Sequence, residues 1–460
     1  MSGGGRALVG LSLVGLASFG CVADDGVPPT RLAVRDGFLR DADGRAVILR
    51  GVNLSGEHKR TSRFAWHRAE DFRRVRTDWG LNAVRLLVAW AAVEPERGRI
   101  DRDYLERLAE RVRWAEEAGL LVVLDLHQDV WGEGFPEGNG APRWTCPEEN
   151  YARHKVPELW LLAYATPEVT GCFDGFWRDG ALQERYAEAW AAVARRLAGS
   201  RAVVGFDVMN EPHWGSHPVW SFEAARLQPF YERVSARVQA EAPHWLPFLE
   251  PAASRNMGLP TGLRPIAGRP FVYAPHSYDA TAEQGLGFSE ERRQAVVDHV
   301  AALAADARAL GAPLWLGEYG GVAGHPGIAA YLDAEYAAAG AVAAGTMVWH
   351  YGKDAGYGLL DETGREKPEL LASLVRPYPS RVAGRPRRYG FEPGARRFEV
   401  VFDPDPESAA PTELVVPPRV YRAGYRVLCD GCVHEVDGDT LRIGQAPTSR
   451  PARVVLEPRQ

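Results

Sequence analysis

The sequence has 460 residues, of which 46% are hydrophobic and 25% are charged, and these proportions exclude a largely disordered chain. With 54 Lys and Arg against 60 Asp and Glu, the formal net charge is −6, so the chain has neither a basic field for nucleic acid nor a polybasic segment for anionic lipid. The length suits one large domain and a smaller one. The 14 Trp and 16 Tyr residues offer flat faces for stacking on sugar rings, although most of them are expected to pack in the core.

The first twenty residues have the pattern of an export signal. Arg6 is followed by a hydrophobic segment, residues 7–17, that is too short and too rich in glycine to span a membrane. The next four residues resemble a bacterial lipoprotein cleavage site that ends at Cys21. We therefore predict an export peptide over residues 1–21, a polar tether over residues 22–31, and a protein that is either secreted or lipid-anchored through Cys21 at the bacterial cell envelope.

The other four cysteines are predicted to form two disulfides, because exported proteins meet an oxidising environment. Proximity in sequence pairs Cys146 with Cys172, and Cys429 with Cys432. A zinc site and a thiol redox role are alternatives for Cys429 and Cys432. Neither has strong support, because the Cys-x-x-Cys pair has no second pair beside it and lies on a glycine turn rather than at the start of a helix.

The central part of the chain predicts a barrel. Residues 32–49 contain two turn signals, Asp36-Gly37 and Asp43-Gly44, and are expected to form hairpins that close the floor of that barrel. Eight strand-like segments then alternate with helical ones, which favours a (β/α)8 TIM barrel over an open doubly wound sheet. The predicted strands cover residues 46–53, 82–88, 120–126, 203–209, 247–250, 271–275, 314–317 and 346–349. The clearest predicted helices cover residues 102–118, 181–198, 223–242 and 290–310.

Two further segments complete the predicted organisation. Residues 132–180 form a long insertion after the third strand, rich in Trp, Pro, Glu and Tyr, which we expect to form part of a substrate wall. From residue 378 the helical period disappears and short strands follow, predicted at residues 398–402, 413–416, 425–428, 440–443 and 453–456. We therefore predict a catalytic barrel over residues 32–377 and a C-terminal all-β sandwich domain over residues 378–460.

Polar and aromatic side chains stand at the ends of most predicted barrel strands. Because the carboxyl ends of barrel strands meet at one face, we expect these side chains to surround one cleft. They are Asn53 and Lys59 after the first strand, Arg85 in the second, His127 and Asp129 after the third, Asn210 and Glu211 after the fourth, His276 and Tyr278 after the sixth, Glu318 after the seventh, and Trp349 at the eighth. No glycine-rich phosphate-binding loop follows any strand, so the sequence predicts no nucleotide cofactor.

Glu211 and Glu318 are the two carboxylates of this set that close apolar strands, and each is bracketed by Pro or Gly: Pro212 follows Glu211, and Gly317 precedes Glu318. Two carboxylates at two strand ends are what a retaining glycosidase requires, one as acid/base and the other as nucleophile. We expect Arg85 to lower the pKa of Glu318 and Tyr278 to donate a hydrogen bond to it. His276 can tune the protonation of Glu211, although as a cation it would oppose that protonation.

The remaining candidates are assigned to substrate. Asn210 is expected to hold the sugar 2-hydroxyl, Asp129 and Lys59 other hydroxyls, and Trp349 the face of a sugar ring. Structural alternatives stay open for three of the set: Arg85 as a salt-bridged barrel residue, His127 as a hydrogen-bonded packing residue, and Lys59 as a solvated surface lysine.

This ordered set of residues resembles glycoside hydrolase family 5, a group of retaining β-glycosidases on (β/α)8 barrels, and the resemblance runs from about residue 32 to residue 378. It is carried by Asn82-Ala83-Val84-Arg85, Asn210-Glu211-Pro212, His276-Ser277-Tyr278, Glu318 and Trp349. The resemblance implies Glu211 as acid/base and Glu318 as nucleophile.

Within family 5 the chain looks most like endoglycoceramidases, which release an intact glycan from ceramide. The features that carry this resemblance are the tail of the third strand, Lys59, the Trp-bearing insertion and the C-terminal sandwich. Residues 213–215, which follow Asn210-Glu211-Pro212, are not diagnostic, and this leaves the preference for particular sugars open. The expected partner is therefore a glycolipid or oligosaccharide, with no cofactor, no metal and a monomeric chain.

Three alternatives remain at this stage. The first is a family 5 endo-β-glucanase or mannanase that acts on polysaccharide. The second is a metal-dependent barrel hydrolase with His127, Asp129, His276 and Glu318 as ligands, which the absence of a second His beside His127 disfavours. The third is a surface lipoprotein that binds glycans without turnover, which the presence of both Glu211 and Glu318 disfavours.

Overall fold

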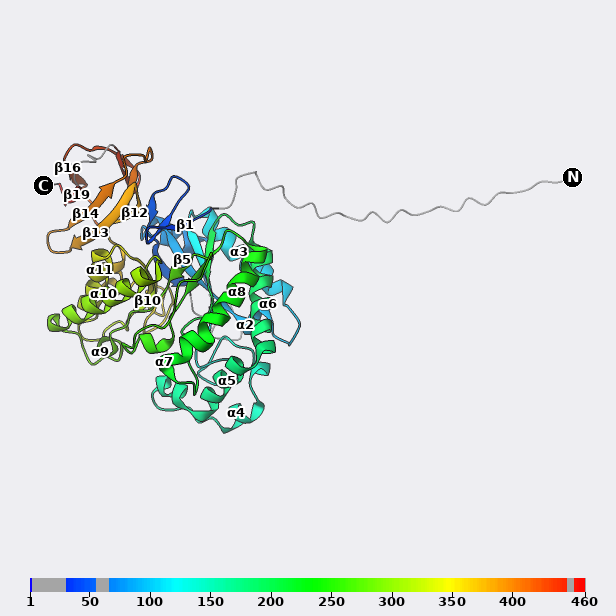
Figure 1. The fold of residues 1–460 in the computed structure, drawn as a ribbon. Helices are drawn as coiled ribbons and strands as arrows, with labels where there is room; N and C mark the ends of the chain where they lie inside the picture. Colours follow the sequence, from blue (N-terminus) through cyan, green and yellow to red (C-terminus); the bar gives the residue numbers. More distant parts are fainter. Residues whose placement is uncertain (2–29, 55–65, 445–450, 460) are drawn as a thin grey trace.

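A computed structural model describes residue 1 and residues 30–54, 66–444 and 451–459 of the chain. Two predicted features, Cys21 and Lys59, lie outside these residues. Figure 1 shows a barrel flanked by long helices, with the C-terminal sheets at one end and the short helices α4 (Glu148–Arg153) and α5 (Pro167–Arg178) at the other. Among the described residues, no helix is both long enough and apolar enough to span a lipid bilayer.

The barrel consists of eight parallel strands in the order β10-β11-β4-β5-β6-β7-β8-β9. A parallel bridge between Tyr273 and Leu314, with Tyr273 N donating to Pro313 O at 3.0 Å, brings the two edge strands together, so the barrel is nearly closed. The predicted (β/α)8 fold is therefore confirmed. The strands are β4 (Arg50–Leu54), β5 (Ala83–Ala89), β6 (Leu121–His127), β7 (Val203–Asp207), β8 (Leu246–Leu249), β9 (Val272–Tyr273), β10 (Trp315–Gly320) and β11 (Gly345–Trp349).

The helices around the barrel follow the predicted segments closely. Gly80 and Gly119, with φ of +70° and +75°, lie just beyond the ends of α1 and α3, in the left-handed conformation that a helix C-terminus favours in glycine. Asp101 caps the start of α3 by accepting a hydrogen bond from Tyr104 N. The long helices are α1 (Ala69–Thr77), α3 (Arg102–Glu117), α6 (Gly180–Leu197), α8 (Gln228–Glu241), α10 (Arg293–Leu310) and α11 (Ile328–Ala341); α12 (Pro368–Leu374) is shorter.

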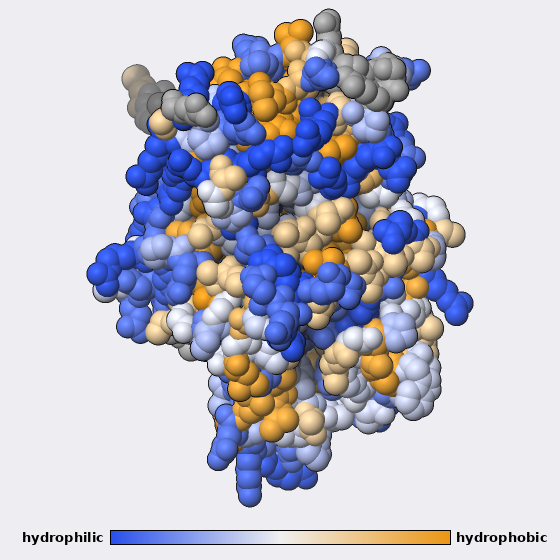
Figure 2. All heavy atoms as spheres, turned by 90° about the vertical axis from the view of Figure 1, so that its left-hand side faces the viewer, coloured by the Kyte–Doolittle hydropathy of each residue, from blue (hydrophilic) through white to orange (hydrophobic). Residues whose placement is uncertain are grey.

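The C-terminal region is an antiparallel all-β unit of two sheets, as predicted. One sheet has the order β13-β14-β19-β16 and the other β1-β2-β3-β12-β15-β18-β17. The strands of this region are β12 (Tyr378–Val382), β13 (Gly384–Glu392), β14 (Arg397–Pro404), β15 (Thr412–Val415), β16 (Tyr425–Cys429), β17 (Val433–Asp437), β18 (Thr440–Gly444) and β19 (Ala452–Pro458). Figure 2 shows hydrophobic residues at the upper end of the molecule, where these sheets lie, and a second group near the lower end.

The N-terminal hairpin contacts both the C-terminal region and the barrel. Its strands β1 (Ala33–Arg35), β2 (Phe38–Arg40) and β3 (Ala46–Val47) extend the seven-stranded sheet, because Val47 pairs with Arg381 of β12. Leu39 and Val47 also belong, with Trp315, to the hydrophobic cluster at the amino-terminal ends of the barrel strands. The predicted floor is therefore present, but the predicted first strand, residues 46–53, divides into β3 in this sheet and β4 in the barrel.

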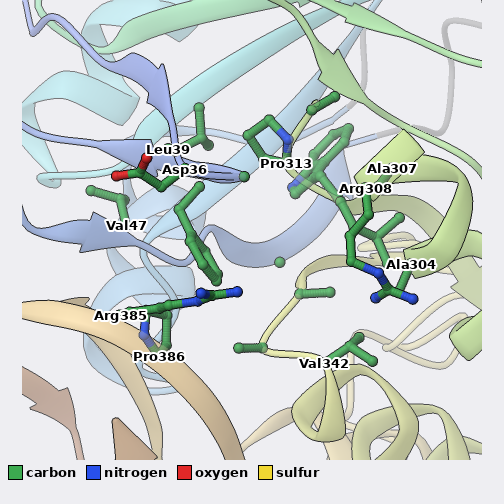
Figure 3. A pocket seen from close by; sticks show the side chains of 18 of the residues that line it. Asp36, Leu39, Val47, Ala304, Ala307, Arg308, Pro313, Val342, Arg385 and Pro386 are labelled. Atoms are coloured by element: carbon green, nitrogen blue, oxygen red, sulfur yellow. The ribbon is translucent and has the colours of Figure 1, made fainter. Parts of the chain in front are cut away.

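The hairpin, the barrel and the C-terminal region meet around a cavity of about 580 Å³. Figure 3 shows Asp36 and Leu39 of the hairpin on one side of it, Arg308 of α10 on another, and Arg385 and Pro386 of β13 below them. Trp315 and Gly345, at the first residues of β10 and β11, also line it. The cavity thus lies at the opposite end of the barrel from the carboxyl ends of the strands.

Candidate active site

Arg85, on β5, lies at the centre of the carboxyl end of the barrel and is fully buried. Its guanidinium forms ion pairs with carboxylates from four other strands or strand ends: Glu318 at 2.6 Å, Asp207 at 2.9 Å, Glu250 at 3.0 Å and Asp125 at 3.1 Å. Burial alone would lower the pKa of Arg85, but these carboxylates raise it well above its ordinary value. Arg85 is therefore both a salt-bridged barrel residue and a direct partner of Glu318.

Glu318, near the end of β10, is held by a cation on one oxygen and a phenol on the other. Arg85 Nη1 donates to Oε1 at 2.6 Å, and the Tyr278 hydroxyl donates to Oε2 at 3.0 Å. Burial raises the pKa of Glu318 above its ordinary value, although His276, Arg85 and His127 act in the opposite direction. The lowering by Arg85 that the sequence predicts is present, but the net shift has the opposite sign because desolvation is the larger effect.

Glu211 follows β7 in a strained backbone conformation and is more accessible than Glu318. Its φ of +40° lies in the left-handed region, where a residue other than glycine is strained by about 1–3 kcal/mol. Its backbone N–H donates to Glu250 Oε2 at 2.8 Å, which holds this conformation. Its Oε1 contacts His276 Nδ1 at 2.9 Å and accepts from Asn256 Nδ2 at 3.0 Å.

His276 joins the two candidate catalytic carboxylates. Its Nδ1 lies 2.9 Å from Glu211 Oε1 and 3.6 Å from Glu318 Oε2, so these two oxygens can be no farther apart than the two distances taken together. This limit accommodates the separation of roughly 5–5.5 Å between the carboxyl groups of retaining enzymes and falls at the lower edge of the roughly 6.5–9.5 Å of inverting ones. Burial would lower the pKa of His276, but Glu250, Glu318 and Glu211 raise it well above its ordinary value, which favours the cationic imidazole.

His127 and Trp349 form a second wall of the site. Their rings stack at 5.3 Å with an interplanar angle of 15°. His127 Nδ1 contacts Asp125 Oδ2 at 2.8 Å and Nε2 contacts Asp129 Oδ2 at 3.3 Å. Burial opposes the charge of His127, but Asp125 and Asp129 outweigh it and raise its pKa to about 9. His127 therefore links Asp129, through this contact, to the ring that stacks on Trp349.

Asn210 is held at both ends of its side-chain amide. Its Oδ1 accepts from Arg85 Nη2 at 3.0 Å, and its Nδ2 donates to Gln128 O at 3.1 Å.

The structure thus gathers nine of the ten predicted catalytic and substrate-binding residues at one end of the barrel, and the tenth, Lys59, lies outside the described residues. The nine are Arg85, His127, Asp129, Asn210, Glu211, His276, Tyr278, Glu318 and Trp349.

Four residues of the site were not found from the sequence: Asp125, Asp207, Glu250 and Asn256. Glu250 had the same signal as Glu211, because an apolar strand ends at Glu250 and Pro251 follows it. Asp125 and Asp207 lie inside apolar strands, where a lone acid predicts a buried ion pair but does not identify its partner. Asn256 follows β8 and gives no signal in the sequence.

Comparison with known proteins agrees with this arrangement. The model of the cellulase family, glycosyl hydrolase family 5, matches residues 40–354, and the model of the glycoside hydrolase family 5 C-terminal domain matches residues 376–455. The first match alone covers more than half of the chain. The chain belongs to glycoside hydrolase family 5.

Several relatives in family 5 are similar over almost the whole chain. Endoglycoceramidase I of Rhodococcus hoagii is 29% identical over 454 residues, which cover 93% of this chain and 86% of that protein. The structure of endo-glycoceramidase II from a Rhodococcus species in complex with ganglioside GM3 is 32% identical, with a TM-score of 0.82, and covers 93% of this chain and all of that one. A structure of the same Rhodococcus enzyme as a lactosyl-enzyme intermediate has a TM-score of 0.80, at 32% identity over 92% of this chain and all of that one.

The insertion after β6 is partly helical. It contains α4 and α5, and the structure joins Cys146, just before α4, to Cys172 in α5. The other cysteine pair, Cys429 and Cys432, is also joined as a disulfide, at the end of β16.

In the described part of the chain, no group of three or more His, Cys, Asp or Glu residues has an arrangement that could hold a metal ion.

Proposed function

We propose that this family 5 protein is an endoglycoceramidase, a retaining endo-β-glycosidase that hydrolyses the bond between an oligosaccharide and ceramide in glycosphingolipids. The observation that carries the hydrolytic chemistry is the position of Glu211 and Glu318 on either side of His276 Nδ1. The two full-length similarities to endoglycoceramidases support the choice of substrate.

The reaction proceeds by double displacement. Glu318 attacks the anomeric carbon while Glu211 gives its proton to the ceramide oxygen, so the glycosidic bond breaks and a glycosyl ester forms on Glu318. Glu211 then takes a proton from water, whose oxygen attacks the same carbon and releases the glycan. Arg85 and His276 keep Glu318 ionised for the first step, and the cationic His276 favours ionised Glu211 for the second.

The sugar-binding roles rest on the hydrogen bonds that orient each side chain. Asn210 is fixed by Arg85 and Gln128, which directs its remaining amide hydrogen to the sugar 2-hydroxyl. Asp129 is fixed by His127 and Asn139 and accepts from another hydroxyl. Trp349, stacked on His127, supports the face of the sugar, and Lys59 binds a further hydroxyl.

Exposed hydrophobic side chains suited to the ceramide part of the substrate occur in the segments that follow β6, β7, β8 and β9, at the carboxyl ends of the barrel strands. Exposed hydrophobic surface of this kind is typical of an interaction site. The most exposed of these side chains is Trp220, at 86%. The group consists of Val156, Leu159, Trp160, Leu161, Leu162, Trp220, Met257, Leu259 and Leu286.

Export accords with this substrate. The hydrophobic segment over residues 7–17 and the two disulfides support secretion, and Cys21 is the residue that lipidation would anchor to the cell envelope. Lipid attachment would hold the enzyme at a membrane surface. Labelling of the expressed protein with a radioactive fatty acid, with Cys21→Ser as control, distinguishes anchoring from plain secretion.

Mass analysis of reaction products tests the proposed function. Purified protein is incubated in detergent with a panel of glycosphingolipids and, separately, with cello- and manno-oligosaccharides; Glu318→Gln is the control. We expect intact oligosaccharide and free ceramide from the wild type and neither from the variant. Cleavage of the oligosaccharides with the glycosphingolipids left intact would replace this proposal with a polysaccharide hydrolase of the same family.

A further inference from the structure

The segment that follows β9 presents its side chains alternately to two sides. His276 and Tyr278 face the catalytic carboxylates, at 2.9 Å from Glu211 and 3.0 Å from Glu318. Ser277, between them, faces α11 instead, where its Oγ lies 2.9 Å from Glu335 Oε1 and 3.1 Å from Oε2. The position of Ser277 therefore determines the position of both neighbours that touch the catalytic pair.

Glu335 is a buried carboxyl group for which the described residues supply no compensating cation. It is 2% exposed, and in the described part of the chain no Lys, Arg or His lies within ion-pair distance of it. An ionised carboxylate buried without a cation is strongly disfavoured, so such groups retain their proton. Glu335 therefore differs from Glu318, which is also buried but faces Arg85 and His276.

The titratable groups around Glu335 agree with a neutral side chain. They are Tyr331, one turn earlier on α11, Asp279, which follows the β9 segment, and Tyr319 on β10. Burial raises the pKa of Glu335 to about 8; Ser277 and Tyr331 act against this shift, and the negative charge of Asp279 adds to it. The charge of Asp279 is itself paired with Arg292 at 2.6 Å.

We propose that Glu335 is a positioning residue that acts as a neutral acid, forming a two-way hydrogen-bonded pair with Ser277 that sets His276 and Tyr278 against the catalytic carboxylates. One oxygen of the protonated carboxyl donates to Ser277 Oγ, and the other accepts the hydroxyl hydrogen of the same Ser277. An ionised carboxylate can only accept, so loss of the proton removes half of the pair. This inference rests on the proposed roles of Glu211 and Glu318.

The backbone of Ser277 transmits this constraint. Ser277 N donates to Glu318 O at 2.9 Å, and Ser277 O accepts from the Tyr331 hydroxyl at 3.1 Å. One residue thus connects α11, the β9 segment and the strand end that carries Glu318. A displacement of about 1 Å in catalytic groups lowers a rate by about 100-fold, so a loosened Ser277 affects the reaction without touching the substrate.

The test compares Glu335→Gln with Glu335→Ala and Ser277→Ala. Glutamine is uncharged, and its amide can donate to Ser277 Oγ and accept from it, as the protonated acid does. Glu291→Gln makes the same chemical change at an exposed position and is the matched control. The kcat and KM of each folded variant are measured from pH 5 to pH 9 on any β-glycoside that the wild type hydrolyses, which keeps this test separate from the identity of the natural substrate.

We expect Glu335→Gln to retain the wild-type kcat within about 2-fold at pH 6 and to lose activity less steeply than the wild type above about pH 8. Glu335→Ala and Ser277→Ala are expected to lower kcat by up to about 100-fold with KM changed much less. The proposal is overturned if Glu335→Gln is as impaired as Glu335→Ala at pH 6, or if its alkaline profile is the same as that of the wild type and of Glu291→Gln. If Glu335→Ala does not fold, an unchanged kcat in Ser277→Ala overturns it equally.

Discussion

Two fully buried arginines, Arg50 and Arg85, stand on neighbouring barrel strands but serve opposite ends of the barrel. Arg85 faces four carboxylates at the carboxyl end. Arg50, at the start of β4, donates to the backbone oxygens of Ser373 and Arg376 and lies over the rings of Tyr336 and Tyr378, at 4.6 and 5.5 Å. Arg85 is thus compensated by buried carboxylates that include the proposed nucleophile, Glu318, whereas Arg50 is compensated by backbone oxygens and aromatic rings near the C-terminal region.

The two ends of the barrel are therefore expected to respond differently to substitution. Substitutions around Arg85 are expected to change the reaction, because they alter the charges around Glu318 and Glu211. Substitutions around Arg50 are expected to change the free energy of unfolding and leave the reaction of the folded molecules intact.

The largest effect is expected for Glu318→Gln. The amide cannot form the glycosyl ester, so we expect kcat to fall on the order of 10⁴-fold or more, with circular dichroism and melting temperature close to those of the wild type. Steady-state assays beside the control Glu291→Gln measure this. Residual activity above about 1% of the wild type would show that Glu318 is not the nucleophile.

Glu211→Ala is expected to lower kcat by about 10²–10⁴-fold for a glycolipid, whose leaving group needs a proton. For an aryl β-glycoside with an acidic phenol, which departs without that proton, the loss in glycosyl-enzyme formation should be much smaller. Added azide should then restore turnover of the aryl glycoside and yield the β-glycosyl azide. An equal loss for both substrates without azide rescue would contradict the acid/base role of Glu211.

Arg85→Met is expected to lower both stability and activity. Removing this cation leaves Asp125, Asp207, Glu250 and Glu318 facing one another in a buried site, and breaking such a buried pair costs about 3–5 kcal/mol in the free energy of unfolding. Urea denaturation gives the stability, and assays of the folded fraction give kcat. A folded variant with wild-type kcat would show that the charge of Arg85 does not act on Glu318.

Arg50→Met is the counterpart of Arg85→Met, because it makes the same substitution of a buried arginine at the opposite end of the barrel. The loss of hydrogen bonds to Ser373 O and Arg376 O leaves buried backbone oxygens unpaired, at about 1–3 kcal/mol. We expect kcat and KM of the folded enzyme to match the wild type. A reduced kcat at full folding would mean that the two ends of the barrel are coupled.

The smallest effect is expected for Tyr278→Phe, on the pH profile. Glu318 must be ionised to attack, and burial raises its pKa, so activity is lost as the pH falls through that raised value. The Tyr278 hydroxyl donates to Glu318 Oε2 and stabilises the ionised form by about 0.5–1.5 kcal/mol, which corresponds to about 0.4–1.1 pH units. We expect the acid limb of kcat/KM to move to higher pH by this amount, and a shift to lower pH would contradict the assignment.

The sequence was sufficient for elements whose signal is local. Glu211 and Glu318 each lie at the end of an apolar segment beside a Pro or Gly, and the long helices 102–117 and 180–197 have a clear hydrophobic period. Strand β17 was missed because all five of its residues are exposed, so no alternation marks it. Strand β13 was missed because Gly384 and Pro386 interrupt its pattern.

Contacts between strands that are distant in the chain could not be predicted from the sequence. The hairpin pairs with the C-terminal sheet through Val47 and Arg381, more than 300 residues apart, and nothing local to either segment indicates it. The net direction of the Glu318 pKa shift depends on how far burial outweighs Arg85, and burial depends on the complete fold. The contact of one imidazole with Glu211, Glu250 and Glu318 requires the ends of four strands to be placed together.

Proton NMR of the glycan as it is released from a glycosphingolipid tests the central claim most directly, because it reports the bond that breaks and the stereochemistry in one spectrum. Two carboxylates that share His276 Nδ1 predict an intact oligosaccharide whose reducing-end sugar appears first as the β-anomer and then equilibrates. Initial release of the α-anomer, or of single sugars from the non-reducing end, would contradict the account.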